Sequence, residues 1–63
     1  MIIYVFLAEG FEEIEAIAPI DIFRRANMEV ITVSISSNKA VCGAHGIKVM
    51  ADTVFAELKF NGD

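Results

Sequence analysis

This 63-residue chain lacks a disulfide pair, a metal-binding cysteine cluster and a basic stretch, and each absence argues against a class of structure or partner. The single cysteine, Cys42, cannot form an internal disulfide, and Cys42 with His45 is too few ligands for a structural zinc site. Five basic residues against nine acidic ones leave a net charge of −4, which argues against nucleic acid and anionic membranes as partners. The apolar N-terminus is too short to span a membrane and has no basic segment before it, so we expect a cytoplasmic protein.

The apolar content is high for so short a chain: 56% of the residues are hydrophobic and the mean hydropathy is +0.57. A domain of this size buries only about 60% of the surface that its unfolded chain exposes. Its interior could not hide so many apolar side chains. We therefore expect the chain to be part of a larger fold or one partner in an assembly.

The order of the expected elements is typical of an α/β fold. Residues 2–7 form a continuous apolar run that suits a strand covered on both faces, and residues 29–35 form a second strand. A helix over 11–26 lies between them, so the strands should be parallel with a right-handed crossover. Residues 40–50 contain two glycines in a central turn and predict a β-hairpin.

Polar residues at the element ends refine this prediction. Asn27 suits a left-handed cap at the end of the first helix. Asp52 or Thr53 is expected to cap a brief helical segment that runs through Leu58.

The predicted helix carries apolar residues on two sides, and Glu15 lies among those of one side. At about 100° per residue, Glu15 lies about 20° from Ile22 on the helical wheel. Its row is formed by Phe11, Ile14, Ala18 and Ile22, and a second row by Ala16, Ile20 and Phe23. Glu12 and Glu13 lie toward the edges of these rows, where a carboxylate reaches water.

Two interpretations of Glu15 follow from this position. A buried carboxyl group tends to keep its proton and to hydrogen-bond, which is what a general acid or a thiolate-supporting acid needs. Alternatively, Glu15 only complements the positive end of the helix dipole, as Glu12 and Glu13 also would.

The segment from Val5 to Ala16, VFLAEGFEEIEA, resembles the opening of the ThiJ/PfpI superfamily, the group of the Parkinson-disease protein deglycase and its bacterial relatives. The similarity continues through PIDIFRRA (19–26), VCGAHGI (41–47) and Ala51-Asp52, where it is closest to the bacterial branch. It implies a flavodoxin-like three-layer α/β sandwich about three times this length. Residues 1–63 would then be the N-terminal fragment of one such domain, comprising its β-α-β unit and a β-hairpin.

The resemblance also implies a site and a partner. Glu15 occupies the position of the family's carboxylic acid, which lies beside a nucleophilic cysteine that would be located beyond residue 63. Members often form homodimers through the first helix, so Ala16, Ile20, Phe23, Arg24 and Arg25 are the expected dimer interface. No cofactor and no metal are expected.

Three functions remain open on this evidence. The whole protein is expected to be a glyoxalase- or deglycase-like enzyme acting on reactive carbonyls, although the superfamily also contains peptidase-like and class I glutamine amidotransferase-like members. The second possibility is a non-enzymatic stress-response chaperone or redox sensor, whose thiol is oxidised. The third is an inactive truncated product, and the 63-residue chain alone is not expected to catalyse a reaction.

The remaining polar and small residues carry weaker signals. Cys42 is interpreted as a small apolar residue before a turn rather than as a nucleophile, and a Cys42–His45 dyad is not expected in a hairpin. His45 is interpreted as a polar turn residue. Gly10 ends the first strand, where α/β sheets bind ligands, and is a weak substrate-binding candidate. Arg24 and Arg25 either bind an acid across the dimer or complement the end of the helix.

Overall fold

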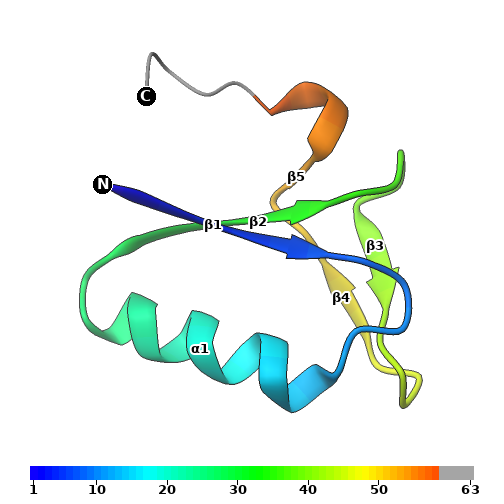
Figure 1. Ribbon diagram of the computed structural model, residues 1–63, viewed down its shortest axis with the longest axis horizontal. Coiled ribbons are helices and arrows are strands. Elements are labelled where there is room, and N and C mark those ends of the chain that lie inside the picture. The colour runs from blue at the N-terminus through cyan, green and yellow to red at the C-terminus, as the bar shows by residue number, and fades with distance from the viewer. Residues whose placement is uncertain (59–63) are drawn as a thin grey trace.

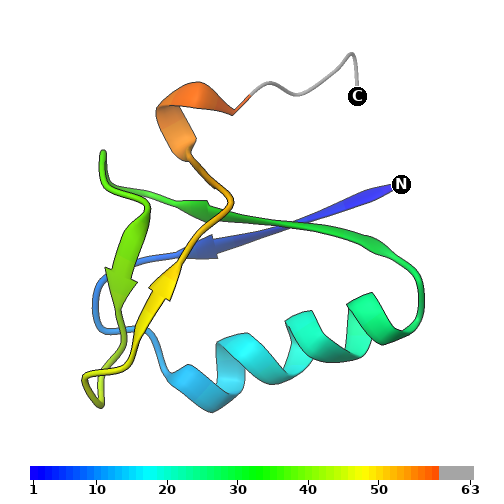
Figure 2. The same cartoon turned by 180° about the vertical axis from the view of Figure 1, so that it is seen from behind.

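The computed structural model describes residues 1–58 of the chain. In chain order its elements are β1 (Ile2–Leu7), α1 (Glu13–Arg25), β2 (Glu29–Ser34), β3 (Ala40–Cys42), β4 (Lys48–Met50), β5 (Thr53–Val54) and the short 3₁₀ helix η1 (Phe55–Glu57). Figures 1 and 2 show α1 along one face of the sheet and the β3–β4 hairpin at the end where β1 finishes. No helix among the described residues is long and apolar enough to cross a membrane.

The central sheet is parallel, as the sequence predicts. β1 pairs with β2 in register from Ile2–Glu29 to Leu7–Ser34, and β5 pairs with the end of β2. The strand order is β1-β2-β5, and β3 and β4 form a separate antiparallel hairpin. The β-α-β unit and the hairpin over residues 40–50 are therefore confirmed.

Helix α1 begins two residues later than predicted and ends where its capping residue was expected. Glu12 is the N-cap, and Glu13 and Glu15 lie in the first turn, where negative charge favours the helix dipole. Asn27 has a φ of 64°, so the predicted left-handed cap is confirmed. The Met28 amide donates to the Phe23 carbonyl at 3.0 Å, which satisfies an end carbonyl of the helix.

The segment after the hairpin differs from the prediction. Thr53 and Val54 form β5, and no side chain caps η1. The Asp52 carboxylate instead accepts hydrogen bonds from the Thr32 amide at 2.9 Å and from the Thr32 hydroxyl at 3.1 Å. Arg24 also donates to Asp52 at 3.1 Å. Asp52 therefore ties β2 to the segment entering β5, because the tertiary fold brings a buried amide to its carboxylate.

The two apolar rows of α1 take the opposite roles to those predicted. Ile20 is buried, and Ala16 and Phe23 are half-buried on the side that faces the sheet. Ala16 packs against the core cluster of Leu7, Val41 and Ala51. The row around Glu15 is the outer one: Ile14 is 82% exposed and Ile22 is 60% exposed.

Two predictions fail for this reason. Glu15 is exposed rather than buried in an apolar sector, and the row of Ala16, Ile20 and Phe23 is covered by the chain's own sheet rather than left open. The periodicity shows that the helix has two apolar sides but carries no information about which one the sheet covers.

Candidate functional site

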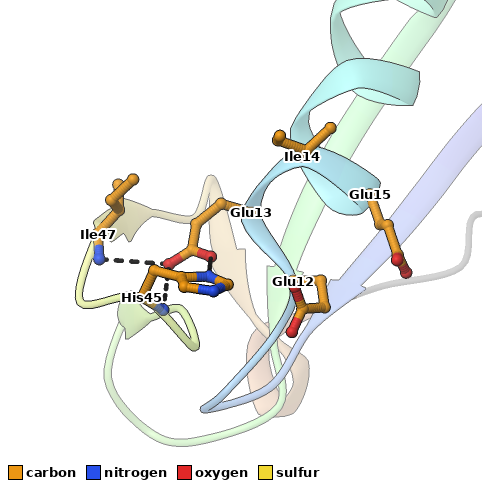
Figure 3. Close-up of a pocket in the computed structure, with 6 residues that line it drawn as sticks. All are labelled: Glu12, Glu13, Ile14, Glu15, His45 and Ile47. Atoms are coloured by element: carbon orange, nitrogen blue, oxygen red, sulfur yellow. Dashed lines mark hydrogen bonds and ion pairs between the residues drawn. The ribbon is translucent and has the colours of Figure 1, made fainter.

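A hollow of about 500 Å³ lies where the first turn of α1 meets the hairpin turn. Its lining residues are Glu12, Glu13, Ile14, Glu15, His45 and Ile47. They come from two segments that are far apart in the chain, and Figure 3 shows how they converge. The helix N-terminus lies at the carboxyl end of β1, the edge at which open α/β sheets bind ligands.

Glu13 is the centre of this arrangement and is only 7% exposed. Its Oε2 accepts a hydrogen bond from the His45 amide at 2.8 Å and a longer one from the Ile47 amide at 3.4 Å. Its Oε1 lies 2.8 Å from Nδ1 of His45 (Figure 3). One carboxylate therefore fastens the hairpin turn to the start of the helix.

These contacts shift the pKa values of both partners. The hydrogen bond from His45 is the main reason that the pKa of Glu13 falls to about 2, and it outweighs the effect of burial, which acts in the opposite direction. The same hydrogen bond, followed by the charges of Glu13 and Glu12, raises the pKa of His45 above 6.5. A charged Glu13–His45 pair is consequently favoured over a wide pH range.

The close approach of helix and hairpin depends on a glycine. A Cβ atom at position 43 would clash with the carboxyl group of Glu13. Glu9 makes a second link between the same segments, because its Oε2 accepts from the Cys42 amide at 3.0 Å. Glu9 and Glu13 were both missed as site residues.

Glu15 lies beside this pair without taking part in it. In Figure 3 its side chain points away from Glu13 and His45. Within residues 1–58 its carboxylate accepts no recorded hydrogen bond, and the group is exposed at the rim of the hollow. The described part of the chain thus leaves the Glu15 carboxylate available at the carboxyl edge of the sheet.

The other predicted site residues have structural partners. Gly10 has a φ of 85° and donates its amide to the Cys42 carbonyl at 2.8 Å, so it is at least a turn glycine. Arg25 pairs with Asp21 one turn earlier at 3.0 Å. Arg24 contacts the Val30 carbonyl at 3.0 Å as well as Asp52.

Cys42 and His45 of the hairpin are not hydrogen-bonded to each other, as the sequence predicts. Cys42 is half-buried, and its Sγ lies 3.6 Å from the Gly43 carbonyl. His45 pairs with Glu13 rather than with Cys42. Among residues 1–58, Glu12, Glu13 and His45 form one cluster in which each side chain offers a potential ligand atom within 4.8 Å of the others.

A parallel β-α-β unit places the protein in the α/β class, and the solved structures that it superposes on identify the fold as flavodoxin-like. The sequence model of the DJ-1/PfpI family matches residues 1–62, and the chain belongs to this family. The resemblance seen in the sequence is therefore confirmed.

Individual relatives agree with this assignment. Protein DJ-1 homolog A of Arabidopsis thaliana is 36% identical over 52 residues, which is 82% of this chain and 13% of the homolog. A DJ-1 superfamily protein of Salmonella typhimurium, crystallised as a cysteine-to-alanine mutant, superposes with a TM-score of 0.87 and 41% identity. That match covers 89% of this chain and 30% of the Salmonella chain.

A third relative is the oxidised DJ-1 of Toxoplasma gondii, with a TM-score of 0.85 and 36% identity over 87% of this chain and 30% of its own. The chain spans less than a third of the length of these three relatives.

Proposed function

We propose that this chain is the N-terminal part of a cysteine-nucleophile enzyme that acts on small reactive carbonyl compounds. In this proposal Glu15 is the acid beside a cysteine contributed from outside the 63 residues. The cysteine thiol adds to the carbonyl carbon, and Glu15 carries or relays the proton that the addition and the later release of product require.

The position of Glu15 is the observation that carries this proposal. The resemblance to the family implies that Glu15 is in its acid position. In the structure Glu15 lies at the carboxyl edge of a parallel sheet and has an exposed carboxylate with no partner recorded among residues 1–58. Glu13, by contrast, is engaged with His45 and Ile47. Of the two acids in the first turn of α1, only Glu15 is available to a group approaching from another segment.

The test is methylglyoxal consumption by the whole protein that contains this segment. Glu15→Gln keeps the shape of the side chain but cannot give up a proton, so turnover should fall about 10²-fold or more. Glu29→Gln is the matched control, because Glu29 is an exposed acid at the start of β2, at the opposite edge of the sheet. Equal turnover in the two variants would remove Glu15 from the mechanism.

The isolated 63-residue chain should not consume methylglyoxal, because its only cysteine sits in the hairpin with no base in contact with its sulfur among residues 1–58. Activity that survives purification and is lost in Cys42→Ser would instead make Cys42 the nucleophile.

Redox sensing is a second candidate, supported by the Toxoplasma relative, whose structure is described as oxidised. Here the thiol of the whole protein is oxidised and Glu15 stabilises the product by a hydrogen bond. Two measurements separate the functions. A redox sensor gains mass on mild peroxide treatment but does not consume methylglyoxal, whereas the enzyme consumes methylglyoxal.

We also propose a homodimer through α1, now assigned to the outer row of the helix. Ile14, Ile17 and Ile22 are 82%, 38% and 60% exposed, and Ile47 of the hairpin extends the same apolar surface at 56%. An exposed apolar stripe of this kind on a helix favours contact with a second protein surface. Arg24 and Arg25 lie at the end of the stripe and could still reach an acid of a partner, since both remain half-exposed or more.

Sedimentation of the chain tests this interface. Ile22→Lys should abolish self-association, whereas Ile35→Lys, which changes a residue of similar exposure (58%) after β2, should not. Dissociation by Ile35→Lys alone would place the contact elsewhere.

A further inference from the structure

We propose that Glu12, Glu13 and His45 form a binding site for one divalent transition-metal ion of the Zn²⁺ type. The proposal is independent of the catalytic function proposed above, because it involves neither Glu15 nor the external cysteine. It rests on the ligand atoms that the helix N-terminus and the hairpin turn bring together.

The distances suit a shared ion. Nδ1 of His45 and Oε1 of Glu13 are 2.8 Å apart, and the three side chains each offer a ligand atom within 4.8 Å of the others. Two ligands that bind one zinc tetrahedrally at about 2.0–2.1 Å lie about 3.3 Å apart. The present 2.8 Å separation is that of a hydrogen bond, so metal binding requires Nδ1 to lose its proton and the two atoms to move apart by about 0.5 Å.

Glu13 is held in place for this role. The His45 and Ile47 amides both donate to Oε2, which fixes the carboxylate while Oε1 faces the imidazole. Such outer hydrogen bonds orient a ligand before the metal arrives. Because Gly43 has no side chain, the hairpin comes close enough to supply them.

The third ligand is free to complete the site. Glu12 is exposed, and its carboxylate has no recorded hydrogen bond to another residue of 1–58. A common ion requires its oxygen to approach the other ligands by up to about 1.5 Å, which a change of rotamer supplies. The His45 side chain is 71% exposed, so the outer side of the ion is open to water, as in zinc sites with three protein ligands.

The ligand set determines which ions bind. One imidazole with two carboxylates suits Zn²⁺, Ni²⁺ or Co²⁺, whereas Mg²⁺ and Ca²⁺ prefer oxygen ligands alone. The two carboxylates also offset the positive end of the α1 dipole, which by itself would repel a cation.

The experiment is calorimetric titration of the untagged Cys42→Ser chain with zinc chloride at pH 7.5, with the thiol removed so that it cannot bind the metal. We expect one ion per chain. Glu12→Gln should weaken binding at least tenfold, and His45→Gln should abolish it. Glu15→Gln is the matched control, because it removes the same charge from the same helix turn but points away from the pair, and it should change the affinity less than threefold.

Three results would overturn the proposal: unchanged zinc affinity in Glu12→Gln, an equal loss in Glu12→Gln and Glu15→Gln, or equally strong binding of Mg²⁺. The first would reduce the site to a Glu13–His45 pair, and the other two would show general attraction by an acidic helix end. Circular dichroism of Glu12→Gln should match the parent chain, since this exposed side chain has no recorded contact to lose.

Discussion

Replacing Asp52 by alanine should destabilise the fold strongly, although Asp52 is exposed and lies outside any helix. Its carboxylate accepts from the amide and hydroxyl of Thr32, a residue only 5% exposed in β2, and from Arg24. The Asp52 amide also donates to the Thr32 hydroxyl at 2.9 Å. These bonds join β2 to the residue just before β5 and so extend the contact between the two strands by one residue.

The magnitude follows from the burial of the Thr32 amide. A buried donor that loses its acceptor costs about 1–3 kcal/mol, while the half-exposed Arg24–Asp52 pair contributes about 0–1 kcal/mol. Asp52→Ala should therefore lower the free energy of unfolding by about 1–4 kcal/mol. That is a large part of the roughly 3–9 kcal/mol expected for a chain of this length.

Asp52→Asn separates the acceptor from the charge. Asparagine keeps a carbonyl oxygen that can accept from Thr32 and loses only the ion pair and the charge on the acceptor, so it should cost about 1 kcal/mol. The assay is urea unfolding followed by circular dichroism, with both variants and the parent chain under identical conditions.

The pH dependence supplies a second check. The hydrogen bond from the Thr32 amide is the main cause that lowers the pKa of Asp52 below its ordinary value of 3.8. A lowered folded-state pKa means that the stabilisation is fully present above about pH 4 and is lost as the pH falls through the folded-state value. The difference in stability between the parent chain and Asp52→Asn should thus shrink in acid. An Asp52→Ala cost below about 0.5 kcal/mol, or equal costs for the two variants, would refute the role of the buried amide.

Three further predictions concern the helix ends and the hairpin. In the metal-free chain, the Glu13–His45 pair should stabilise the fold fully between about pH 4.5 and 6.5, which are the ordinary pKa values of the two groups. The stabilisation is lost as the pH falls toward about 2, the pKa of Glu13, or rises through the raised pKa of His45. NMR titration measures both pKa values directly. Gly43→Ala should push Glu13 away from the hairpin and return the pKa of His45 toward 6.5 in the same titration. Gly46→Ala is the control: its Cβ meets open space but φ is 83°, so it should destabilise the turn without changing the pKa of His45. Asn27→Ala should cost about 1 kcal/mol in thermal or urea unfolding because φ is 64°, while Asn27→Gly should be neutral or better, and equal effects would contradict the capping role.

Much of the site's location could be predicted from the sequence, but the acid that the fold buries is Glu13 rather than Glu15. The wheel argument that places Glu15 about 20° from Ile22 also places Glu13 about 20° from Ile20. The sheet covers Ile20 and leaves Ile22 exposed, so Glu13 is the buried acid. The position of Glu13 beside the second apolar row therefore indicated a buried acid. Choosing between Glu13 and Glu15 required knowing which side of the helix the sheet covers.

The metal-type cluster could not be found from spacing along the chain. Glu13 and His45 are 32 positions apart, and Cys42 with His45 was the only nearby pair that the sequence offered. Asp52 was expected to cap a helix but accepts a hydrogen bond from Thr32, and spacing along the chain could not predict this contact either. The Asp52–Thr32 and Glu13–His45 contacts both join segments that meet only in the folded structure.

The sequence by itself determined the local elements and the family. Continuous β-branched runs, an acidic helix start, a left-handed Asn27 and a glycine turn depend on neighbouring residues, and these patterns place the chain in the DJ-1/PfpI family. Only the tertiary structure decided which side of α1 is covered and which acid meets His45. Those outcomes depend on long-range packing of the helix on its sheet and of the hairpin against the helix, and helical periodicity is equally compatible with either side.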